Sequence, residues 1–257
     1  MKNSQDKKRK SSIKTGQIWQ LGDHRLLCGS SLDATLVKKL IGNTRINAVI
    51  TDPPYGVSYT QSKEGFSAVK VNKRIVNDDI STEGEYVTFT KAWLVPVLPH
   101  LIKKNSIYIF NCDKMLFALK DALDQLHVYF SQLIIWVKNH AVIGRKDYLP
   151  QHELIVFGWF GRHAFRRSKD KSVLFYPKPN KSSRHPTQKP IPLVRHLVLN
   201  ATNVGDVVYE PFAGSGTTLI CCEQTKRRCF AGEVDLEYCA GIISYWEKMS
   251  GQKAKLL

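Results

Sequence analysis

An apolar-rich run from Ile46 to Thr51 ends abruptly at Asp52-Pro53-Pro54, and this junction is the strongest constraint on the fold. Proline cannot continue a central strand, and it holds the residue before it in extended backbone. A short apolar run that stops in this way is typical of a buried strand. The sequence therefore predicts a strand whose carboxyl end presents the Asp52 carboxylate.

Strand-like and helix-like segments alternate along the chain. The predicted strands are 17–21, 24–28, 46–51, 106–111, 128–137, 152–159, 173–176, 207–210 and 228–233. The predicted helices are 32–41, 82 to about 103, 113–126, 191–201, 215–226 and 235–249, with Pro96 and Pro99 interrupting the second. This alternation predicts an α/β fold with a mostly parallel, twisted sheet and helices on both faces. Ligands of such folds bind at the carboxyl ends of the strands, where Asp52, Glu210 and Glu233 fall.

A second segment of chemical interest follows the strand that ends at Glu210. It reads Glu210-Pro211-Phe212-Ala213-Gly214-Ser215-Gly216-Thr217-Thr218 and leads into a predicted helix. Glycines in a strand-to-helix turn let a ligand approach the backbone closely. A Gly-x-Gly turn on its own also caps helices. The segment gains meaning from its combination with Asp52-Pro53-Pro54-Tyr55, which offers a carboxylate beside an aromatic ring.

The length of 257 residues suits one large domain, and the net charge of +16 is unusual. A charge excess of this size favours a polyanionic partner, most simply nucleic acid. We expect residues 1–16, with the run Lys7-Lys8-Arg9-Lys10, to be a disordered basic tail, and residues 17–257 to be a single catalytic domain.

Two further segments are candidates for contacts with nucleic acid. Residues 161–184 mix basic and aromatic side chains, as a short recognition insert would, although a solvated loop has the same composition. The polar stretch 56–79 predicts a long loop that is mobile and orders over substrate. The basic residues we select as DNA contacts are Lys63, Lys70, Lys73, Arg74, Arg166, Arg167 and Lys169.

The six cysteines form no Cys-x-x-Cys pair, and no histidine spacing indicates zinc. We therefore expect no metal. The sequence contains no signal-peptide pattern and no long apolar span, so we expect no membrane association and a cytoplasmic location.

Several motifs together resemble the S-adenosylmethionine-dependent DNA amino-methyltransferases. Asp52-Pro53-Pro54-Tyr55 resembles their catalytic tetrapeptide, and Phe212 to Gly216 resembles their cofactor loop. The catalytic segment precedes the cofactor segment, as in the permuted class beta. The resemblance extends from about Gln17 to Met249 and includes 136–139, His152-Glu153 and 185–190. It implies that His152-Glu153 forms part of the site wall near the target base.

This resemblance implies a Rossmann-like methyltransferase fold and a defined reaction. Asp52 and the Pro53 carbonyl would accept the two hydrogens of an exocyclic amine, which localises its lone pair for direct methyl transfer. Pro54 would stiffen the turn, and Tyr55 would stack on a base flipped out of the duplex. An aspartate in the first position favours the N6 amine of adenine, whereas serine favours the N4 amine of cytosine.

The resemblance also assigns the cofactor side. The segment Glu210 to Thr218 would surround S-adenosylmethionine, and Glu233 would hold its ribose hydroxyls. Thr187, Gln188 and Lys189 match the segment that contacts the methionine end, with a phosphate contact as the alternative for Lys189. Two residues depart from the family: Glu210 and Ser30 stand where aspartate is usual. Ser31 or Asp33 are the residues that could substitute for the missing acid at position 30.

Other functions stay open at this point. A nucleic-acid-binding protein with an inactive methyltransferase fold has the same composition, and Asp-Pro-Pro-Tyr sites also act on planar amines of RNA or protein. Methylation of cytosine C5 is disfavoured, because no Pro-Cys pair supplies the nucleophile. Compact members of this class often pair, so we expect a homodimer.

Overall fold

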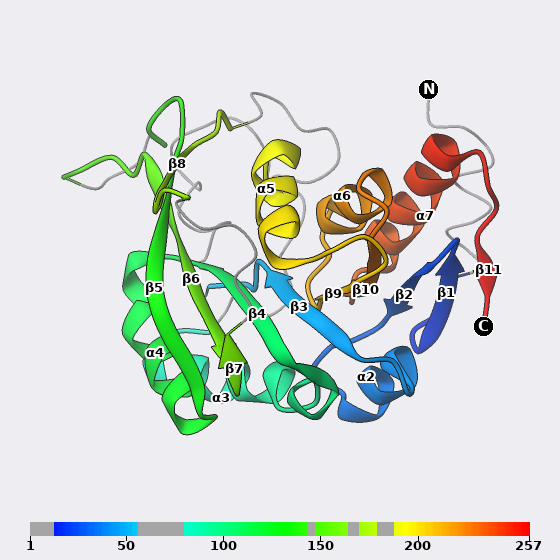
Figure 1. Ribbon diagram of the computed structural model, residues 1–257, viewed down its shortest axis with the longest axis horizontal. Helices are drawn as coiled ribbons and strands as arrows, with labels where there is room; N and C mark the ends of the chain where they lie inside the picture. The colour runs from blue at the N-terminus through cyan, green and yellow to red at the C-terminus, as the bar shows by residue number, and fades with distance from the viewer. Residues whose placement is uncertain (1–12, 56–79, 143–146, 164–169, 179–187) are drawn as a thin grey trace.

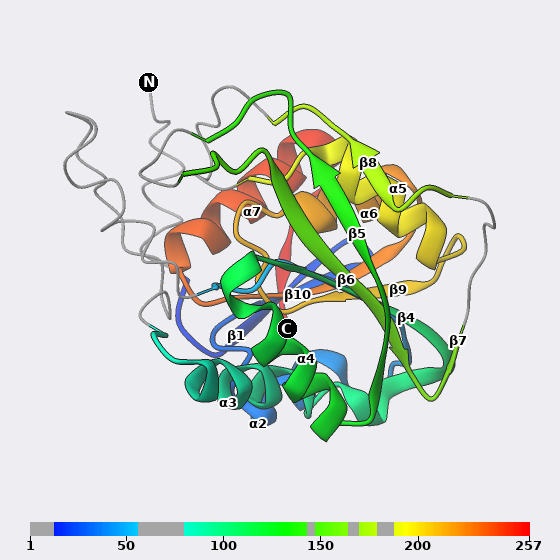
Figure 2. The same ribbon diagram turned by 90° about the vertical axis from the view of Figure 1, so that its left-hand side faces the viewer.

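The computed structural model describes residues 13–55, 80–142, 147–163, 170–178 and 188–257. Its helices and strands form three layers, with a twisted sheet between two groups of helices (Figure 1, Figure 2). The helices are α2 (Ala34–Ile41), α3 (Glu83–Leu94), α4 (Leu116–Gln125), α5 (Ile191–Ala201), α6 (Thr217–Gln224) and α7 (Leu236–Ser250). The short 3-10 helices η2 (Leu98–His100) and η3 (Asp113–Met115) flank the fourth strand.

The strands are β1 (Gln17–Leu21), β2 (His24–Cys28), β3 (Ile46–Thr51), β4 (Leu101–Asn111), β5 (Val128–Val137), β6 (His152–Phe160), β7 (Arg162–His163), β8 (Val173–Phe175), β9 (Val207–Glu210), β10 (Arg228–Glu233) and β11 (Lys255–Leu256). Within the described residues their order is β11-β1-β2-β10-β9-β3-β4-β6-β5-β8, with β7 beside β4. The central strands β2, β10, β9, β3 and β4 pair parallel with one another. The sheet is mixed as a whole, because β1–β2, β1–β11, β4–β6 and β5–β6 pair antiparallel.

Each face of the sheet is covered by its own set of helices. Ile50 and Val208 point to the side of α5, α6 and α7, where Leu197, Ile220 and Trp246 are buried. Their strand neighbours Val49 and Val207 point to the side of α2, α3 and α4, where Leu40, Trp93 and Leu119 are buried. The period-two alternation of a strand between two apolar layers produces this arrangement. The α/β fold and its Rossmann-like form are therefore confirmed, with the parallel part confined largely to the centre.

The helix predicted for 82 to about 103 is shorter than expected. It begins as the capping-box pattern predicts: Thr82 accepts from the backbone of Glu85, and the Glu85 side chain accepts from the backbone of Thr82. It ends at Leu94, and β4 already starts at Leu101. Pro96 and Pro99 end the helix because each lacks the amide hydrogen that the next turn requires.

The folded domain begins earlier than Gln17. Ile13 is buried in the core, and the amide of Gly16 donates to the Cys28 carbonyl at 2.8 Å. Residues 13–16 therefore belong to the domain and not to the tail, while residues 1–12 lie outside the described part. In the part of the chain that the structure describes, no helix has both the length and the apolar character needed to cross a bilayer.

Candidate active site

The two segments singled out in the sequence line a single cavity of about 350 Å³. The cavity lies at the carboxyl ends of the central strands: Asp52 follows β3, Asn111 ends β4, Glu210 ends β9 and Glu233 ends β10. Parallel strands bring these ends to one edge of the sheet, as expected for an α/β fold. The volume is within the range of about 300–1,000 Å³ that is usual for small-molecule sites.

Most of the predicted site residues line this cavity. They are Ser30, Asp52, Pro53, Pro54, Tyr55, Gln188, Lys189, Glu210, Pro211, Phe212, Ala213, Gly214, Ser215, Thr217, Thr218 and Glu233. Thr187 lies outside the described residues, as do all seven predicted DNA contacts, Lys63, Lys70, Lys73, Arg74, Arg166, Arg167 and Lys169. The predicted loop 56–79 lies outside the described residues too.

Gly216 belongs to the predicted cofactor loop but is not among the residues that line the cavity. Its φ is +78°, and a Cβ built on it would lie 2.9 Å from Cγ1 of Ile242. Glycine is therefore required here by the left-handed backbone and by the packing of the turn against α7. Its role in the loop is to shape the start of α6, whereas Gly214 and Ser215 face the cavity.

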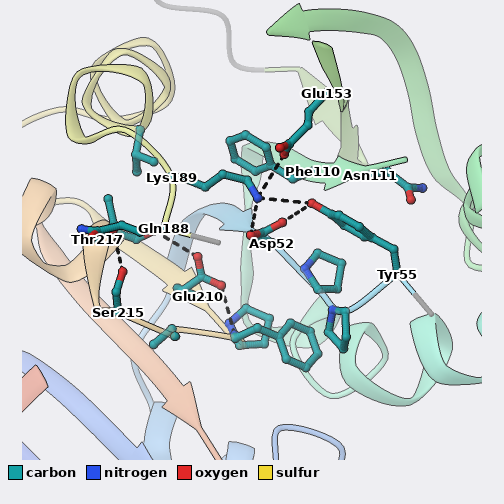
Figure 3. Close-up of a pocket in the computed structure, with 18 of the residues that line it drawn as sticks. Asp52, Tyr55, Phe110, Asn111, Glu153, Gln188, Lys189, Glu210, Ser215 and Thr217 are labelled. Atoms are coloured by element: carbon teal, nitrogen blue, oxygen red, sulfur yellow. Dashed lines mark hydrogen bonds and ion pairs between the residues drawn. The ribbon is translucent and has the colours of Figure 1, made fainter. Parts of the chain in front are cut away.

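The Asp52 carboxylate has a partner on each of its oxygens. The Tyr55 hydroxyl donates to Oδ1, and the Lys189 ammonium donates to Oδ2 (Figure 3). The Asp52 side chain keeps 23% of its surface exposed, toward the cavity that it lines, whereas Lys189 keeps 8%. Burial raises the pKa of Asp52, and the positive charge of Lys189 opposes that rise.

Lys189 also faces a second carboxylate. Its Nζ lies 3.1 Å from Oε2 of Glu153, and the other oxygen of Glu153 lies 3.0 Å from Nζ of Lys138. Burial would raise the pKa of Glu153, but the two ammonium groups together lower it below its ordinary value. Burial disfavours the charge of Lys189, and Asp52 and Glu153 more than compensate, so the pKa of Lys189 is raised. A phosphate contact by this buried lysine has no support in the geometry.

Glu210 connects three elements of the fold at the start of the glycine-rich segment. Its Oε1 accepts from the Thr51 hydroxyl at 2.7 Å and from the amide of Phe212 at 3.0 Å, and its Oε2 accepts from the Thr218 hydroxyl at 3.0 Å. Burial raises the pKa of Glu210 to about 8, against these hydrogen bonds. Both oxygens therefore have partners in the protein, so the longer side chain at this position has a structural role, because it ties β3, β9 and α6 together.

Glu233 holds the glycine turn on the other side of the cavity. Its Oε2 accepts from the amide of Gly214 at 2.7 Å, and its Oε1 accepts from the amide of Asp235 at 2.8 Å. Burial raises the pKa of Glu233 to about 7. The neighbouring Gly232 has no room for a side chain, because a Cβ there would lie 2.2 Å from Oγ of Ser31. The closely packed backbone and the carboxylate at the strand end fit a nucleoside-like group.

The expected substitutes for an acid at position 30 are both engaged elsewhere. The Asp33 carboxylate caps α2 by accepting from the amides of Thr35 and Leu36, and Asp33 does not line the cavity. Ser31 lines it, but its hydroxyl donates to the Pro211 carbonyl at 2.8 Å. Ser30 itself lines the cavity, with its hydroxyl oxygen 3.2 Å from the amide of Leu32. An acid near this end is instead Asp235, which also caps α7.

Sequence reasoning missed part of the catalytic wall. His152 and Glu153, which the resemblance places in the wall of the site, both line the cavity. Lys138 stands out in the sequence only as a member of the motif 136–139, yet it pairs with Glu153 in the charge cluster next to Asp52. Phe110 and Asn111 were missed altogether, although both line the cavity. The signal that could have identified these residues is their place at a strand end, because β4 ends at Asn111 and β5 ends one residue before Lys138.

Among the described residues, no group of three or more His, Cys, Asp or Glu side chains could hold a metal ion.

The described part of the proposed recognition insert is attached to the sheet. β8 pairs parallel with β5 through Ile135 and Val173, and the amide of Lys178 donates to Oδ1 of Asn139 at 2.9 Å. Lys178 also lines the cavity. Residues 161–184 therefore include an edge strand next to the site, with 164–169 and 179–184 outside the described residues.

Comparison with known proteins agrees with this geometry. The profile of the DNA methylase family with N6 and N4 amino specificity matches residues 46–178 and 159–244. The type II methyltransferase M.HpaI of Haemophilus parainfluenzae is 27% identical over 243 residues, covering 84% of this chain and 72% of the relative. The type II methyltransferase M1.MboII of Moraxella bovis is 23% identical over 260 residues, covering 84% of this chain and 92% of the relative.

Solved structures show the same fold. The M1.HpyAVI–SAM complex superimposes with a TM-score of 0.63 at 21% identity, covering 86% of this chain and 98% of the other. The cytosine-N4-specific PvuII DNA methyltransferase gives a TM-score of 0.66 at 15% identity, covering 90% and 92%. With the profile spanning most of the chain and both motif segments in one cavity, the protein belongs to the N6/N4 DNA methylase family.

Proposed function

We propose that this protein methylates the N6 amine of adenine in DNA, with S-adenosylmethionine as the methyl donor. The observation that carries the proposal is the position of Asp52: its carboxylate lines the cavity at the end of β3, directly before Pro53-Pro54-Tyr55. Aspartate at the first position of this tetrapeptide favours adenine, by resemblance to the family.

The amine side of the reaction follows from the residues around Asp52. An exocyclic amine is a poor nucleophile because its lone pair is delocalised into the ring. Hydrogen bonds from its two hydrogens to the Asp52 carboxylate and the Pro53 carbonyl would localise that lone pair on nitrogen. Lys189 favours the charged form of Asp52, which is the better acceptor. The amine would take the place of the Tyr55 hydroxyl on Oδ1, leaving the Tyr55 ring free to stack on the base.

The cofactor side uses the opposite end of the cavity. S-adenosylmethionine, when bound, supplies an electrophilic methyl group on a sulfonium. Glu233 would accept the ribose hydroxyls, and the turn at Gly214 and Ser215 would approach the methionine part. Gln188 also lines the cavity, beside Thr217 (Figure 3), and would contact that part as well. The presence of Gly214 and Asp52 in one cavity supports direct transfer.

Nucleoside mass spectrometry of DNA treated with the protein and S-adenosylmethionine tests the proposal. We expect N6-methyladenine, and at least about 10³-fold less of it from the Asp52→Ala variant in the same time. N4-methylcytosine alone would contradict the adenine assignment while leaving the family function intact. Methyl transfer to RNA or protein, with none to DNA, would contradict the DNA substrate.

The second candidate is methylation of cytosine at N4. It is favoured by the structural likeness to the cytosine-N4-specific PvuII enzyme, whose fold this chain shares. The fold therefore does not separate the two bases, and the tetrapeptide is the feature that favours adenine. The same mass-spectrometric experiment decides between them.

DNA and a second copy of the chain are the proposed partners. The net charge of +16 supports binding to the phosphate backbone, and the basic segments 56–79 and 161–184 flank the site in sequence. We propose a homodimer from the compact form of the domain. Light scattering coupled to gel filtration should give about twice the monomer mass of 29.2 kDa; a monomeric mass at micromolar concentration would contradict it.

A further inference from the structure

The Asp52 carboxylate is the last member of a chain of alternating charges. Lys138 follows β5, Glu153 lies on β6, Lys189 precedes α5 and Asp52 follows β3. Nζ of Lys138 lies 3.0 Å from Glu153, Nζ of Lys189 lies 3.1 Å from Glu153, and Lys189 donates directly to Asp52. Figure 3 shows Lys189 between Glu153 and Asp52. Two cations and two anions thus alternate across four separate parts of the fold.

Glu153 occupies a central position in this chain. The two lysines are nearly buried, with 5% and 8% of their side chains exposed, and an ammonium group removed from water needs carboxylate partners. Glu153 offers one oxygen to each lysine, so it is shared by both. On its other sides Lys189 meets Asp52 and the ring of Phe110, whose centroid lies 5.0 Å from Nζ.

We propose that Glu153, supported by Lys138, is a positioning residue for methyl transfer: it holds the Lys189 ammonium against Oδ2 of Asp52. Lys189 in turn favours the ionised form of the Asp52 carboxylate and leaves Oδ1 as the oxygen that exchanges the Tyr55 hydroxyl for the amine of the base. This inference rests on the proposed function. Glu153 acts through Lys189 and touches neither base nor cofactor in this scheme.

The electrostatics agree with this arrangement. Lys189 and Lys138 lower the pKa of Glu153 against its burial, and Asp52 and Glu153 raise the pKa of Lys189. The Glu153 carboxylate and the Lys189 ammonium are therefore both charged at neutral pH. Without Glu153, Lys189 would have one carboxylate instead of two, and its ammonium would be free to leave Oδ2 for other acceptors in the cavity.

A double-mutant cycle in kcat tests the link. We expect Glu153→Gln to lower kcat about 30-fold, with the Kd for S-adenosylmethionine and the KM for DNA within about threefold of wild type. Lys189→Met should lower kcat about 100-fold. Because Glu153 acts through Lys189, the double variant should lie within about threefold of Lys189→Met alone. A purely structural role would instead give losses that multiply to about 3,000-fold, and this would overturn the proposal.

Two variants guard against a folding artefact. Glu247→Gln removes another buried glutamate with a lysine neighbour, Lys253, on the part of α7 that does not line the cavity. It should leave kcat within about twofold. If Glu153→Gln fails to fold because Lys138 loses its ion pair, Lys138→Met/Glu153→Gln removes both charges. This pair of changes then takes the place of Glu153→Gln in the cycle with Lys189→Met, with the same expected non-additivity.

A readout that needs no DNA separates this inference from the proposed function. Lys189 acetylation by dilute acetic anhydride, followed by peptide mass spectrometry, should be slow in the wild type. It should be at least about fivefold faster in Glu153→Gln, but unchanged in Glu247→Gln. An unchanged rate in Glu153→Gln would overturn the inference. If the wild type methylates no DNA while the acetylation rate responds as expected, the proposed substrate is wrong and the holding of Lys189 by Glu153 stands.

Discussion

The buried carboxylates at the two ends of the cavity have different kinds of partners. At the catalytic end, the carboxylates of Asp52 and Glu153 have lysine partners that come from distant parts of the chain. At the cofactor end, the carboxylates of Glu210 and Glu233 accept hydrogen bonds from backbone amides and hydroxyls, mostly of neighbouring turns. Charged partners stabilise an anion in a buried site, and neutral donors do so less strongly.

The difference shows in the acid strengths. At the catalytic end, lysines lower the pKa of Glu153, and Lys189 opposes the rise that burial causes in the pKa of Asp52. At the cofactor end, burial raises the pKa of Glu210 to about 8 and that of Glu233 to about 7. We infer that the residues of the catalytic end stabilise charged side chains. Those of the cofactor end stabilise the conformation of the backbone. Substitutions at the first should therefore reduce turnover, and substitutions at the second should reduce cofactor affinity or stability.

The largest effect is expected at Asp52. Asp52→Ala should lower kcat by about 10³-fold or more, because it removes the acceptor of the reacting amine. The Kd for S-adenosylmethionine, measured by calorimetry, should stay within about threefold of wild type, since Lys189 keeps Glu153 as a partner. A variant that retains activity within about tenfold, or about 1.4 kcal/mol, would contradict the mechanism.

The next effect concerns Glu233 and pH. Its pKa is raised to about 7 by burial, so its ionised form increases as the pH rises through 7. The ribose hydroxyls need an acceptor, so the cofactor should bind about tenfold more tightly at pH 8 than at pH 6. Glu233→Gln should bind more weakly and lose most of this pH dependence.

The raised pKa of Glu233 also affects the stability of the protein without cofactor. A raised folded-state pKa favours the protonated form, so the stabilisation from Glu233 is present below its ordinary value of 4.5 and is lost as the pH rises through about 7. Thermal unfolding without cofactor should therefore lose stability between pH 5 and about 8, and Glu233→Gln should flatten this decline. An identical slope in both proteins would contradict the assignment.

The contiguous parts of the molecule were predictable from the sequence. The bounds of β3, α5, β9 and β10 coincide with the predicted segments, because each has a clear apolar pattern with a distinct start or stop signal. Residues 95 to about 103 were assigned wrongly to the helix, because 98–100 form η2 and the strand β4 begins at Leu101. The apolar residues near Leu101 suit a helix or a strand equally, and the pairing of Leu101 with Ile46 of β3, a tertiary contact, decides for the strand.

The candidate site shows the same limit. Asp52-Pro53-Pro54-Tyr55 and the turn at Gly214 were found because each is a short continuous motif. The Lys138–Glu153–Lys189 link was not found, because its contacts join residues from the end of β5, from β6 and from the segment before α5. A lysine in sequence carries no sign of which carboxylate it will meet. The role of Gly216 was misplaced for the same reason, since Ile242 is its neighbour only in space.

A smaller effect is expected at Gly216, where a substitution changes the shape of the turn at the cofactor end without changing its charge. Gly216→Ala forces a side chain onto a φ of +78° and against Ile242, so we expect a loss of about 1–3 kcal/mol in the free energy of unfolding, measured with urea. Gly241→Ala is the matched control: it is exposed within α7 and has no atom near its Cβ position, so it should gain about 0.5–1 kcal/mol. Equal stability changes in the two variants would show that the turn relaxes freely.

The smallest effect is expected at Ser30, where the family usually has aspartate. Ser30 lines the cofactor end, and its hydroxyl oxygen is near the Leu32 amide, a contact that an aspartate could keep. Ser30→Asp should add one acceptor for the adenine amine and tighten S-adenosylmethionine binding by about three- to tenfold, or about 1 kcal/mol, with kcat unchanged. Ser30→Asn, which offers an acceptor without the charge, is the control and should give less. Binding that weakens in Ser30→Asp would mean that Asp235 and the packed turn at Gly232 leave no room for an acid. The cofactor end would then recognise S-adenosylmethionine by shape and not by an added charge. The contrast with the catalytic end, where charged partners surround Asp52, would be sharper than proposed.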